Sequence, residues 1–175
     1  MSQPSADRRL FVALWPTTPT LRRIEALQVR LPAVGRRVAT ANIHLTLAFL
    51  GKVSPERAAE CDRALSRVRV PAFRLSLDRI GTWRRSRVLW LSTRQETESI
   101  QQLADEVRKK LADAGFPRES RPFRTHVTLA RKVDRRPPVL RFQPIDWPVD
   151  RFFLTVSDLH PAGARYSNIR EWTLS

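Results

Sequence analysis

The hydrophobic and polar positions of the chain follow two periods, one typical of strands and the other of helices. A continuous apolar run over residues 10–15 is ended by a proline and predicts a buried strand. Apolar residues then recur three and four positions apart over residues 21–31, which predicts an amphipathic helix. The same spacing predicts helices over residues 55–69 and 97–115, the second closed by glycine and proline.

Strand patterns outnumber helical ones in the rest of the chain. Alternating apolar and polar residues over 73–80 predict a strand with one solvated face. Apolar runs predict further strands over residues 43–50, 88–91, 125–132, 152–156 and 165–174. Gly51 is predicted to end the first of these, and the prolines of residues 134–148 predict a surface loop. This balance of elements predicts an α+β fold with mostly antiparallel sheets.

One tetrapeptide occurs twice in the sequence. It reads His44-Leu45-Thr46-Leu47 and, 82 positions later (126 minus 44), His126-Val127-Thr128-Leu129. Two of the three histidines in the chain head this motif. Side chains alternate across a strand, so each copy presents its histidine and threonine on one face and its aliphatic residues to the core.

The elements around the two copies form a weak internal repeat of strand, helix and motif strand. Leu14 corresponds to Leu91 at an offset of 77 (91 minus 14), and Leu21 corresponds to Ile100 at 79 (100 minus 21). The repeat predicts two similar lobes whose motif strands face one another across a cleft. We expect one two-lobed domain over residues 1–175, with residues 1–8 as a flexible tail.

The composition adds a strong positive charge. The chain of 175 residues carries a net charge of +15, and its pI is about 11.6. Lysine accounts for only four of the 32 basic residues, so 28 are arginine. Arginine suits bidentate contacts with phosphate, although such a bias can also be spread over a solvated surface. The charge therefore favours a phosphate-bearing partner without identifying one.

Several common kinds of machinery are missing from the sequence. Cys61 is the only cysteine, which excludes an intrachain disulfide and a cysteine-rich zinc site. There is no His-Glu-x-x-His or Gly-x-Ser-x-Gly motif, and Gly51-Lys52 lacks the rest of a phosphate-binding loop. Because these motifs are missing, we expect that the protein needs no metal or cofactor. The N-terminal stretch resembles neither a signal peptide nor a membrane span, so we expect a cytoplasmic protein.

Two histidines facing one cleft suit general acid–base catalysis. Imidazole titrates near pH ~6.5, so one ring can be neutral while its partner is protonated. Each threonine hydroxyl can donate to a phosphoryl oxygen. Arg131 could add positive charge, but regular alternation places it on the face opposite His126, so this role requires the strand to twist or end there. For His160, which lacks the motif, we expect a structural role.

The paired motifs resemble those of the two-histidine phosphoesterase superfamily, in particular its bacterial branch of RNA 2′,3′-cyclic phosphodiesterases, also called 2′–5′ RNA ligases. The resemblance rests on residues 44–51, 86–91 and 121–131 and extends over nearly the whole chain. The chain departs from many members at Arg124-Thr125, where they have His-Pro. The resemblance implies a bilobed, pseudo-twofold α+β fold, with two mainly antiparallel sheets flanking a central groove and helices on the outside.

The resemblance also implies a reaction and its residues. It is the hydrolysis of RNA 2′,3′-cyclic phosphate ends to 2′-phosphomonoesters, without a metal ion. By this resemblance His44 is the proton donor and His126 the proton acceptor, while Thr46, Thr128 and Arg131 bind the phosphate. The implied partner is RNA or an oligonucleotide with a cyclic phosphate end, bound by a monomer away from membranes.

Three alternatives stay open at this point. ATP-independent 2′–5′ RNA ligation would run the same site backwards, with a 5′-hydroxyl in place of water. A non-catalytic RNA-end-binding module would bind without turnover, and its affinity would fall steeply with salt. A purely structural role of both motifs would make histidine variants lose stability rather than activity. The spacing of the motifs is symmetric, so the sequence alone leaves the acid and base roles unassigned.

Overall fold

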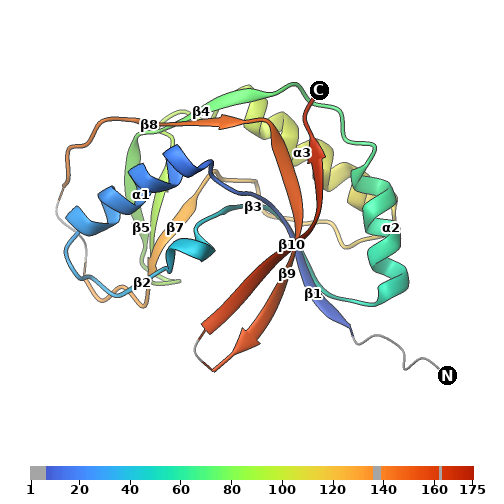
Figure 1. Cartoon of the computed structure of the whole chain (residues 1–175), viewed down its shortest axis with the longest axis horizontal. Helices are drawn as coiled ribbons and strands as arrows, with labels where there is room; N and C mark the ends of the chain where they lie inside the picture. The colour runs from blue at the N-terminus through green and yellow to red at the C-terminus, as the bar shows by residue number, and fades with distance from the viewer. Residues whose placement is uncertain (1–6, 136–138, 162) are drawn as a thin grey trace.

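The computed structural model describes residues 7–135, 139–161 and 163–175. Within them the chain folds into helices and antiparallel strands (Figure 1). Three are α-helices: α1 (Thr18–Arg30), α2 (Pro55–Leu65) and α3 (Glu98–Asp113). The strands are β1 (Arg8–Leu14), β2 (Arg36–Arg37), β3 (Leu45–Val53), β4 (Phe73–Leu77), β5 (Arg79–Trp83), β6 (Val88–Ser92), β7 (Val127–Arg131), β8 (Ile145–Val149), β9 (Arg151–His160) and β10 (Gly163–Thr173). A short 3₁₀ helix, Thr40–Asn42, precedes β3.

The larger sheet consists of two halves. Its strand order is β10-β9-β1-β3-β7-β6-β5, with β2 beside β7, and β4 and β8 form a separate two-stranded sheet. β3 and β7 pair only at Leu45 and Val127, so this single pair joins the half that carries the first motif to the half that carries the second. The predicted α+β fold with antiparallel sheets is confirmed.

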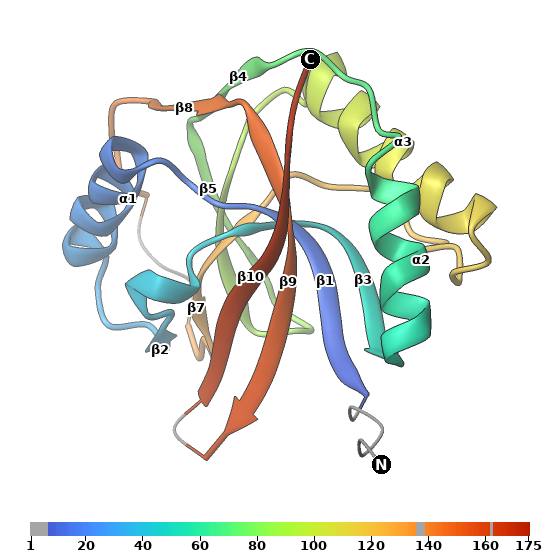
Figure 2. The same ribbon diagram turned by 45° about the vertical axis from the view of Figure 1, so that its right-hand side comes forward.

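The strand pairing around the first motif is repeated around the second. Leu14 of β1 lies opposite Leu45 of the first motif, and Leu91 of β6 lies opposite Val127 of the second. Leu14 and Leu91 are the residues that the internal repeat pairs. α1 lies on one flank of the molecule, and α2 and α3 lie side by side on the other (Figure 2). The helices therefore cover the outside, as predicted.

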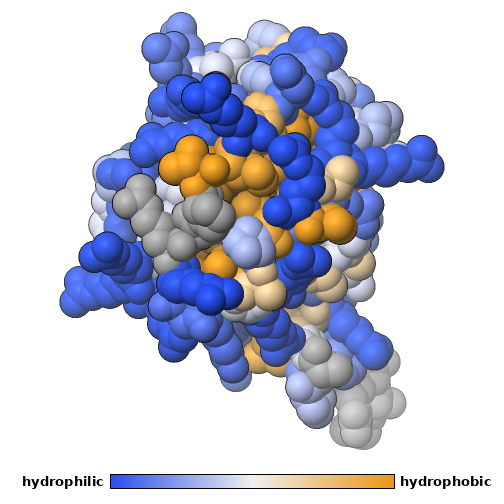
Figure 3. All heavy atoms as spheres, turned by 90° about the vertical axis from the view of Figure 1, so that its left-hand side faces the viewer, coloured by the Kyte–Doolittle hydropathy of each residue, from blue (hydrophilic) through white to orange (hydrophobic). Residues whose placement is uncertain are grey.

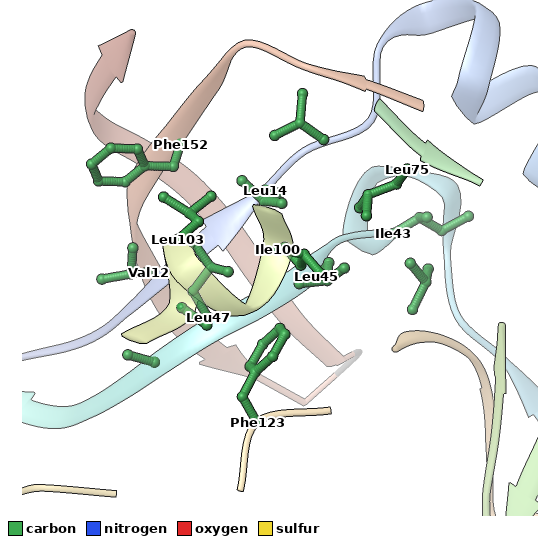
Figure 4. Close-up of a cluster of buried hydrophobic side chains, with 14 of the residues drawn as sticks. Val12, Leu14, Ile43, Leu45, Leu47, Leu75, Ile100, Leu103, Phe123 and Phe152 are labelled. Carbon is green, nitrogen blue, oxygen red and sulfur yellow. The ribbon is translucent and has the colours of Figure 1, made fainter. Parts of the chain in front are cut away.

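Helix α3 packs against the strands of the first motif. Ile100 and Leu103 are fully buried and lie among aliphatic side chains of β1 and β3, including Leu14 and Leu45 (Figure 4). Leu47 is also buried in this cluster. Removing a leucine side chain from such a core typically costs about 2–5 kcal/mol, so this packing stabilises the motif strand against α3.

Several predicted boundaries are wrong. The helix over residues 55–69 ends at Leu65. The first motif strand does not end at Gly51, because this glycine adopts a φ of +71° opposite Leu10 and the strand continues to Val53. The strand predicted over 73–80 is two strands, β4 and β5. β1 begins at Arg8, inside the predicted tail, and residues 1–6 lie outside the described residues.

The predicted loop over residues 134–148 is also wrong at its end. β8 occupies its last residues and buries Ile145, Trp147 and Val149 on one face. Pro148 lies opposite Arg74 in the two-stranded sheet, on the other face of β8. A proline is tolerated there because an edge strand needs no backbone donor on its outer side. Residues 136–138 of the predicted loop lie outside the described residues.

Candidate active site

The two motifs meet at the centre of the larger sheet. The four histidine and threonine side chains line one groove of about 350 Å³. The complete lining is Arg9, Leu10, Phe11, His44, Thr46, Phe49, His126, Thr128, Arg131, Ser157, Leu159, Ala164 and Tyr166. All five residues predicted to act at the site therefore lie together. His160 is not among them.

The two imidazoles are held in the same way. The Nδ1 atom of His44 lies 2.7 Å from the carbonyl oxygen of Asn42, and that of His126 lies 2.8 Å from the carbonyl oxygen of Arg124. A carbonyl can only accept a hydrogen bond, so each Nδ1 carries a proton and donates it. The Nε2 atom of each neutral ring is then free to act as a base. The Nε2 of His44 lies 3.1 Å from the Thr46 hydroxyl.

The surroundings of the two rings differ. His44 is enclosed by Phe11, Trp15 and Tyr166, with ring centroids 5.0, 5.2 and 5.1 Å away. Among the described residues, His126 has one aromatic neighbour, Trp83, at 4.7 Å. Sequence reasoning did not find these aromatic residues. They come from β1, the residue that follows it, β5 and β10, and they approach the motifs only in the folded chain.

Burial lowers the pKa of both histidines. The pKa of His44 falls from 6.5 to about 4, mainly through burial, and the positive charges of His126 and Arg131 lower it further. The pKa of His126 is lowered mainly by burial and then by Arg131, against the hydrogen bond to Arg124. Burial therefore favours two neutral imidazoles at neutral pH. A bound anion would offset this burial and favour protonation.

A β-bulge brings Arg131 into the groove. Along the β6–β7 pair, Trp90 lies opposite Thr128 and Leu89 opposite Ala130, which leaves Leu129 without a partner. The extra residue reverses the alternation, so Arg131 returns to the face of Thr128. Regular alternation had placed Arg131 on the opposite face, and the bulge removes this difficulty.

The first motif contains the same bulge. Ala13 lies opposite Thr46 and Val12 opposite Ala48, so Leu47 is the unpartnered residue. Phe49 then occupies the position that Arg131 holds in the second half, and its side chain is 65% exposed at the groove. The sequence carries a signal for both bulges, because two successive aliphatic residues follow each motif threonine.

Helix side chains bind the carbonyl group of each bulge. The Nε2 of Gln28, on α1, donates to the Leu129 carbonyl oxygen at 3.0 Å. The Nε of Arg108, on α3, donates to the Leu47 carbonyl oxygen at 3.2 Å. The backbone N–H of Val38 also donates to the Leu129 oxygen, at 2.9 Å. The two helices thereby fix the backbone of both motif strands.

The segment before the second motif is fixed by a carboxylate. Glu96 accepts hydrogen bonds from the backbone N–H of Thr125, at 2.8 Å, and from its hydroxyl group. The Ser92 hydroxyl donates to the Thr125 carbonyl oxygen. These bonds hold the approach to His126 in place.

A further cavity, which we call the second arm, continues the groove. It is a cavity of about 730 Å³ that shares Thr46, Phe49 and His126 with the groove. Its other lining residues are Leu47, Ala48, Trp83, Arg85, Ser86, Arg108, Glu119, Arg121, Pro122, Phe123 and Arg124. His44 does not line it.

A larger cavity lies elsewhere. It measures about 850 Å³ and is lined by residues of β5 together with Val139, Leu140 and Phe142, and neither motif contributes to it. Figure 3, viewed from the side of α1, shows an apolar patch enclosed by hydrophilic residues.

Two negative findings apply to residues 7–135, 139–161 and 163–175. No cluster of three or more His, Cys, Asp or Glu side chains suited to a metal ion is found there. No helix there is long and apolar enough to cross a membrane. Cys61 is buried, and burial raises the pKa of its thiol to about 12, which disfavours the reactive thiolate.

Paired strands that present a histidine and a threonine from each half of a pseudo-symmetric α+β fold define a two-histidine phosphoesterase. The family described as the 2′-5′ RNA ligase superfamily matches residues 15–161. The chain belongs to this family.

Individual relatives are similar over their whole length. The RNA 2′,3′-cyclic phosphodiesterase of Escherichia coli (strain K12) is 37% identical, and the alignment covers 100% of this chain and 99% of the relative. The protein of the same name from Archaeoglobus fulgidus is 30% identical, covering 93% and 98%. The crystal structure of Escherichia coli LigT in apo form has a TM-score of 0.87 at 35% identity, covering 98% and 99%. LigT complexed with 3′-AMP has a TM-score of 0.84.

Proposed function

We propose that this protein is an enzyme that hydrolyses RNA 2′,3′-cyclic phosphate ends to 2′-phosphomonoesters. The main support is the pair of imidazoles in one groove, each fixed through Nδ1 so that Nε2 is available for proton transfer. The full-length relatives named RNA 2′,3′-cyclic phosphodiesterase support the choice of substrate. No step of this reaction requires a metal ion or a nucleotide.

In the proposed reaction His126 is the proton acceptor and His44 the proton donor, following the order of the family's motifs. The neutral Nε2 of His126 takes a proton from water, and the water oxygen bonds to phosphorus. The bond from phosphorus to O3′ breaks, and O3′ takes a proton from Nε2 of His44. A lowered pKa makes protonated His44 a stronger acid, and the bound phosphate anion favours its protonation.

The remaining groove residues would bind the phosphate. The hydroxyl groups of Thr46 and Thr128 would donate to its non-bridging oxygens. Arg131 would supply a positive charge and a planar set of donors, which match the charge that develops on these oxygens. This assignment is supported by the bulge at Leu129, which places Arg131 on the groove face beside Thr128.

Product analysis tests the proposal. The purified protein, treated with EDTA, is incubated with adenosine 2′,3′-cyclic phosphate, and the products are separated by chromatography. We expect adenosine 2′-phosphate as the product and a loss of at least about 10²-fold in His44→Ala and in His126→Ala. Exclusive formation of the 3′ isomer would contradict the mechanism, and binding without turnover would indicate a non-catalytic module. His160→Ala is the matched control, because His160 lies outside the groove.

We also propose that the protein acts on RNA as a monomer in the cytoplasm, with its two half-sheets forming one domain. Residues of both halves belong to one buried cluster, which supports a single domain. Light scattering should give a mass near 20.2 kDa, whereas a multiple of it would contradict the monomer.

A further inference from the structure

The second arm opens on one side of the histidine pair only. It shares Thr46, Phe49 and His126 with the groove, whereas His44 lines the groove and not the arm. A cyclic mononucleotide and a water molecule do not require a further cavity of about 730 Å³. The volume and position of the second arm therefore indicate that a larger group binds next to His126.

The geometry of phosphoryl transfer indicates which group this is. The entering oxygen and the leaving oxygen lie on opposite sides of phosphorus in an in-line displacement. Under the proposed function His44 serves O3′ of the terminal ribose, so His126 serves the oxygen on the opposite side. Whatever is attached to that oxygen must extend past His126 and away from His44. The second arm occupies this direction.

We propose that the second arm binds the nucleoside that carries the 5′-oxygen of a 2′–5′ linkage. That nucleoside is the 5′-hydroxyl partner when RNA ends are joined, and the leaving nucleoside when a 2′–5′ linkage is cleaved. The inference rests on the proposed function and extends it from the cyclic phosphate to the group on its far side.

Aromatic side chains in the second arm suit a nucleobase. Trp83 lies 4.7 Å from His126 between ring centroids, at an interplanar angle of 66°. Phe49, which is 65% exposed, also lines the arm and comes from the other half of the molecule. Every nucleobase has a π face, so an accessible aromatic ring can bind it without sequence preference.

The charge of the second arm suits an RNA strand that continues from this nucleoside. Arg85, Arg121 and Arg124 are all exposed at its lining. Arg121 pairs with Glu119, but in the described part of the chain no ion pair involves Arg85 or Arg124. These two guanidinium groups complement the phosphates that follow the nucleoside.

The chemical step balances without a further reactant. In joining, Nε2 of His126 takes the proton of the 5′-hydroxyl group, and O5′ bonds to phosphorus. The bond from phosphorus to O3′ breaks, and O3′ receives a proton from His44. In cleavage each step is reversed, so the 3′-hydroxyl group attacks and O5′ leaves with a proton from His126. No water is consumed in either direction.

Two substrates separate the second arm from the rest of the groove. The first is adenosine 2′,3′-cyclic phosphate, which occupies only the groove. The second is 2′–5′-linked diadenosine monophosphate, from which cleavage releases adenosine. In Trp83→Leu an apolar side chain remains beside His126, but the stacking surface is lost. We expect adenosine release to fall about 10–100-fold relative to cyclic phosphate hydrolysis by the same variant.

Two neighbouring arginines supply a matched pair of variants. Arg85 lines the second arm, whereas Arg84 lines the separate cavity of about 850 Å³ instead. With a 2′–5′-linked substrate that carries a further 3′-phosphate on its leaving nucleoside, Arg85→Ala should slow cleavage by about 3–10-fold. Arg84→Ala removes the same charge and should leave this rate unchanged.

The possible outcomes are distinct. Equal loss of both reactions in Trp83→Leu, or equal effects of Arg84→Ala and Arg85→Ala, would overturn the second arm as a nucleoside site. Wild-type protein that hydrolyses the cyclic phosphate but releases no adenosine from the dimer would do so as well. Wild-type protein that leaves the cyclic phosphate intact would overturn the proposed function, and this inference with it.

Discussion

The two motif histidines share one orientation but differ in their surroundings. Each donates from Nδ1 to the carbonyl group two residues earlier in the chain, so the orientation is built into the motif itself. The enclosure of His44 by three aromatic rings is built by the fold. The shared ring orientation accompanies the repeated tetrapeptide. The aromatic enclosure accounts for the deep burial that lowers the pKa of His44.

This burial predicts an acid-sensitive stability. The pKa of His44 is about 4 in the folded protein, against 6.5 in the unfolded chain, so the folded state binds fewer protons between these values. The contribution of His44 is complete above pH 6.5 and is lost as the pH falls towards 4, and it is on the order of 3 kcal/mol. Urea unfolding from pH 7 to 4 should show a smaller loss of stability in His44→Asn than in the wild type. Equal slopes would contradict the lowered pKa.

Arg131 gives a second prediction at the scale of single residues. Because it lies on the groove face, Arg131→Gln should lower kcat/KM for a cyclic phosphate by about 10–100-fold, the usual effect of losing a hydrogen bond to a charged group. Lys132→Gln removes the same charge one residue later, outside the groove, and should have little effect. Steady-state kinetics of both variants distinguish a local contact from a general loss of charge, which would affect them equally.

At the scale of elements, the bulges connect the helices to the site. Gln28 donates to the carbonyl group of the Leu129 bulge, and that bulge determines the face on which Arg131 emerges. We therefore expect Gln28→Met to lower kcat/KM by about 3–30-fold through Arg131, with a stability loss of about 1–2 kcal/mol. A double-mutant cycle tests this route.

If Gln28 acts through Arg131, the kinetic effect of Gln28→Met should largely vanish in the Arg131→Gln background. The loss of stability should remain in both backgrounds, because it comes from the lost hydrogen bonds of the Gln28 amide to the Leu129 and Val38 carbonyl groups. Full additivity of the two kinetic effects would assign Gln28 a purely structural role.

The same elements show what could be predicted from the sequence and what could not. Periodicity located the motif strands, the three helices and the face shared by His44 and Thr46, because these depend on local spacing. It missed β8, since Pro148 on an edge strand looks like a loop residue. It could not place Arg131, because a bulge changes the alternation and is stabilised by Gln28, about a hundred residues away in the sequence.

At the scale of the whole molecule, the site exists only where the two halves meet. A single residue pair, Leu45 with Val127, joins the half-sheets, and one residue earlier in each motif stands its histidine. The first half adds Phe49 at the position where the second half adds Arg131. Pseudo-symmetry thus gives each half a histidine that can act as an acid or a base. The departure from symmetry gives the groove an apolar side chain, Phe49, in one half and a charged side chain, Arg131, in the other.

The net charge of +15 gives the last prediction, which concerns the whole surface. Neutralising each phosphate of a single strand releases counterions, so the logarithm of affinity should fall with the logarithm of salt concentration with a slope of about −0.7 per phosphate contacted. We expect the slope for an RNA with a 2′,3′-cyclic phosphate end to exceed that for adenosine 2′,3′-cyclic phosphate, since the longer ligand reaches more arginines. KM values from 50 to 300 mM salt measure both slopes.

The arginine variants can show which charges cause a difference in salt dependence between the ligands. For a 2′–5′-linked RNA, whose leaving strand lies in the second arm, Arg124→Ala should reduce the slope by about 0.7, and it should leave that for the mononucleotide unchanged. Arg84→Ala should reduce neither, because Arg84 lines the separate cavity of about 850 Å³. Equal reductions by both variants would mean that the charge acts as a diffuse field over the surface. Equal slopes for the two wild-type ligands would mean that only the terminal phosphate is bound.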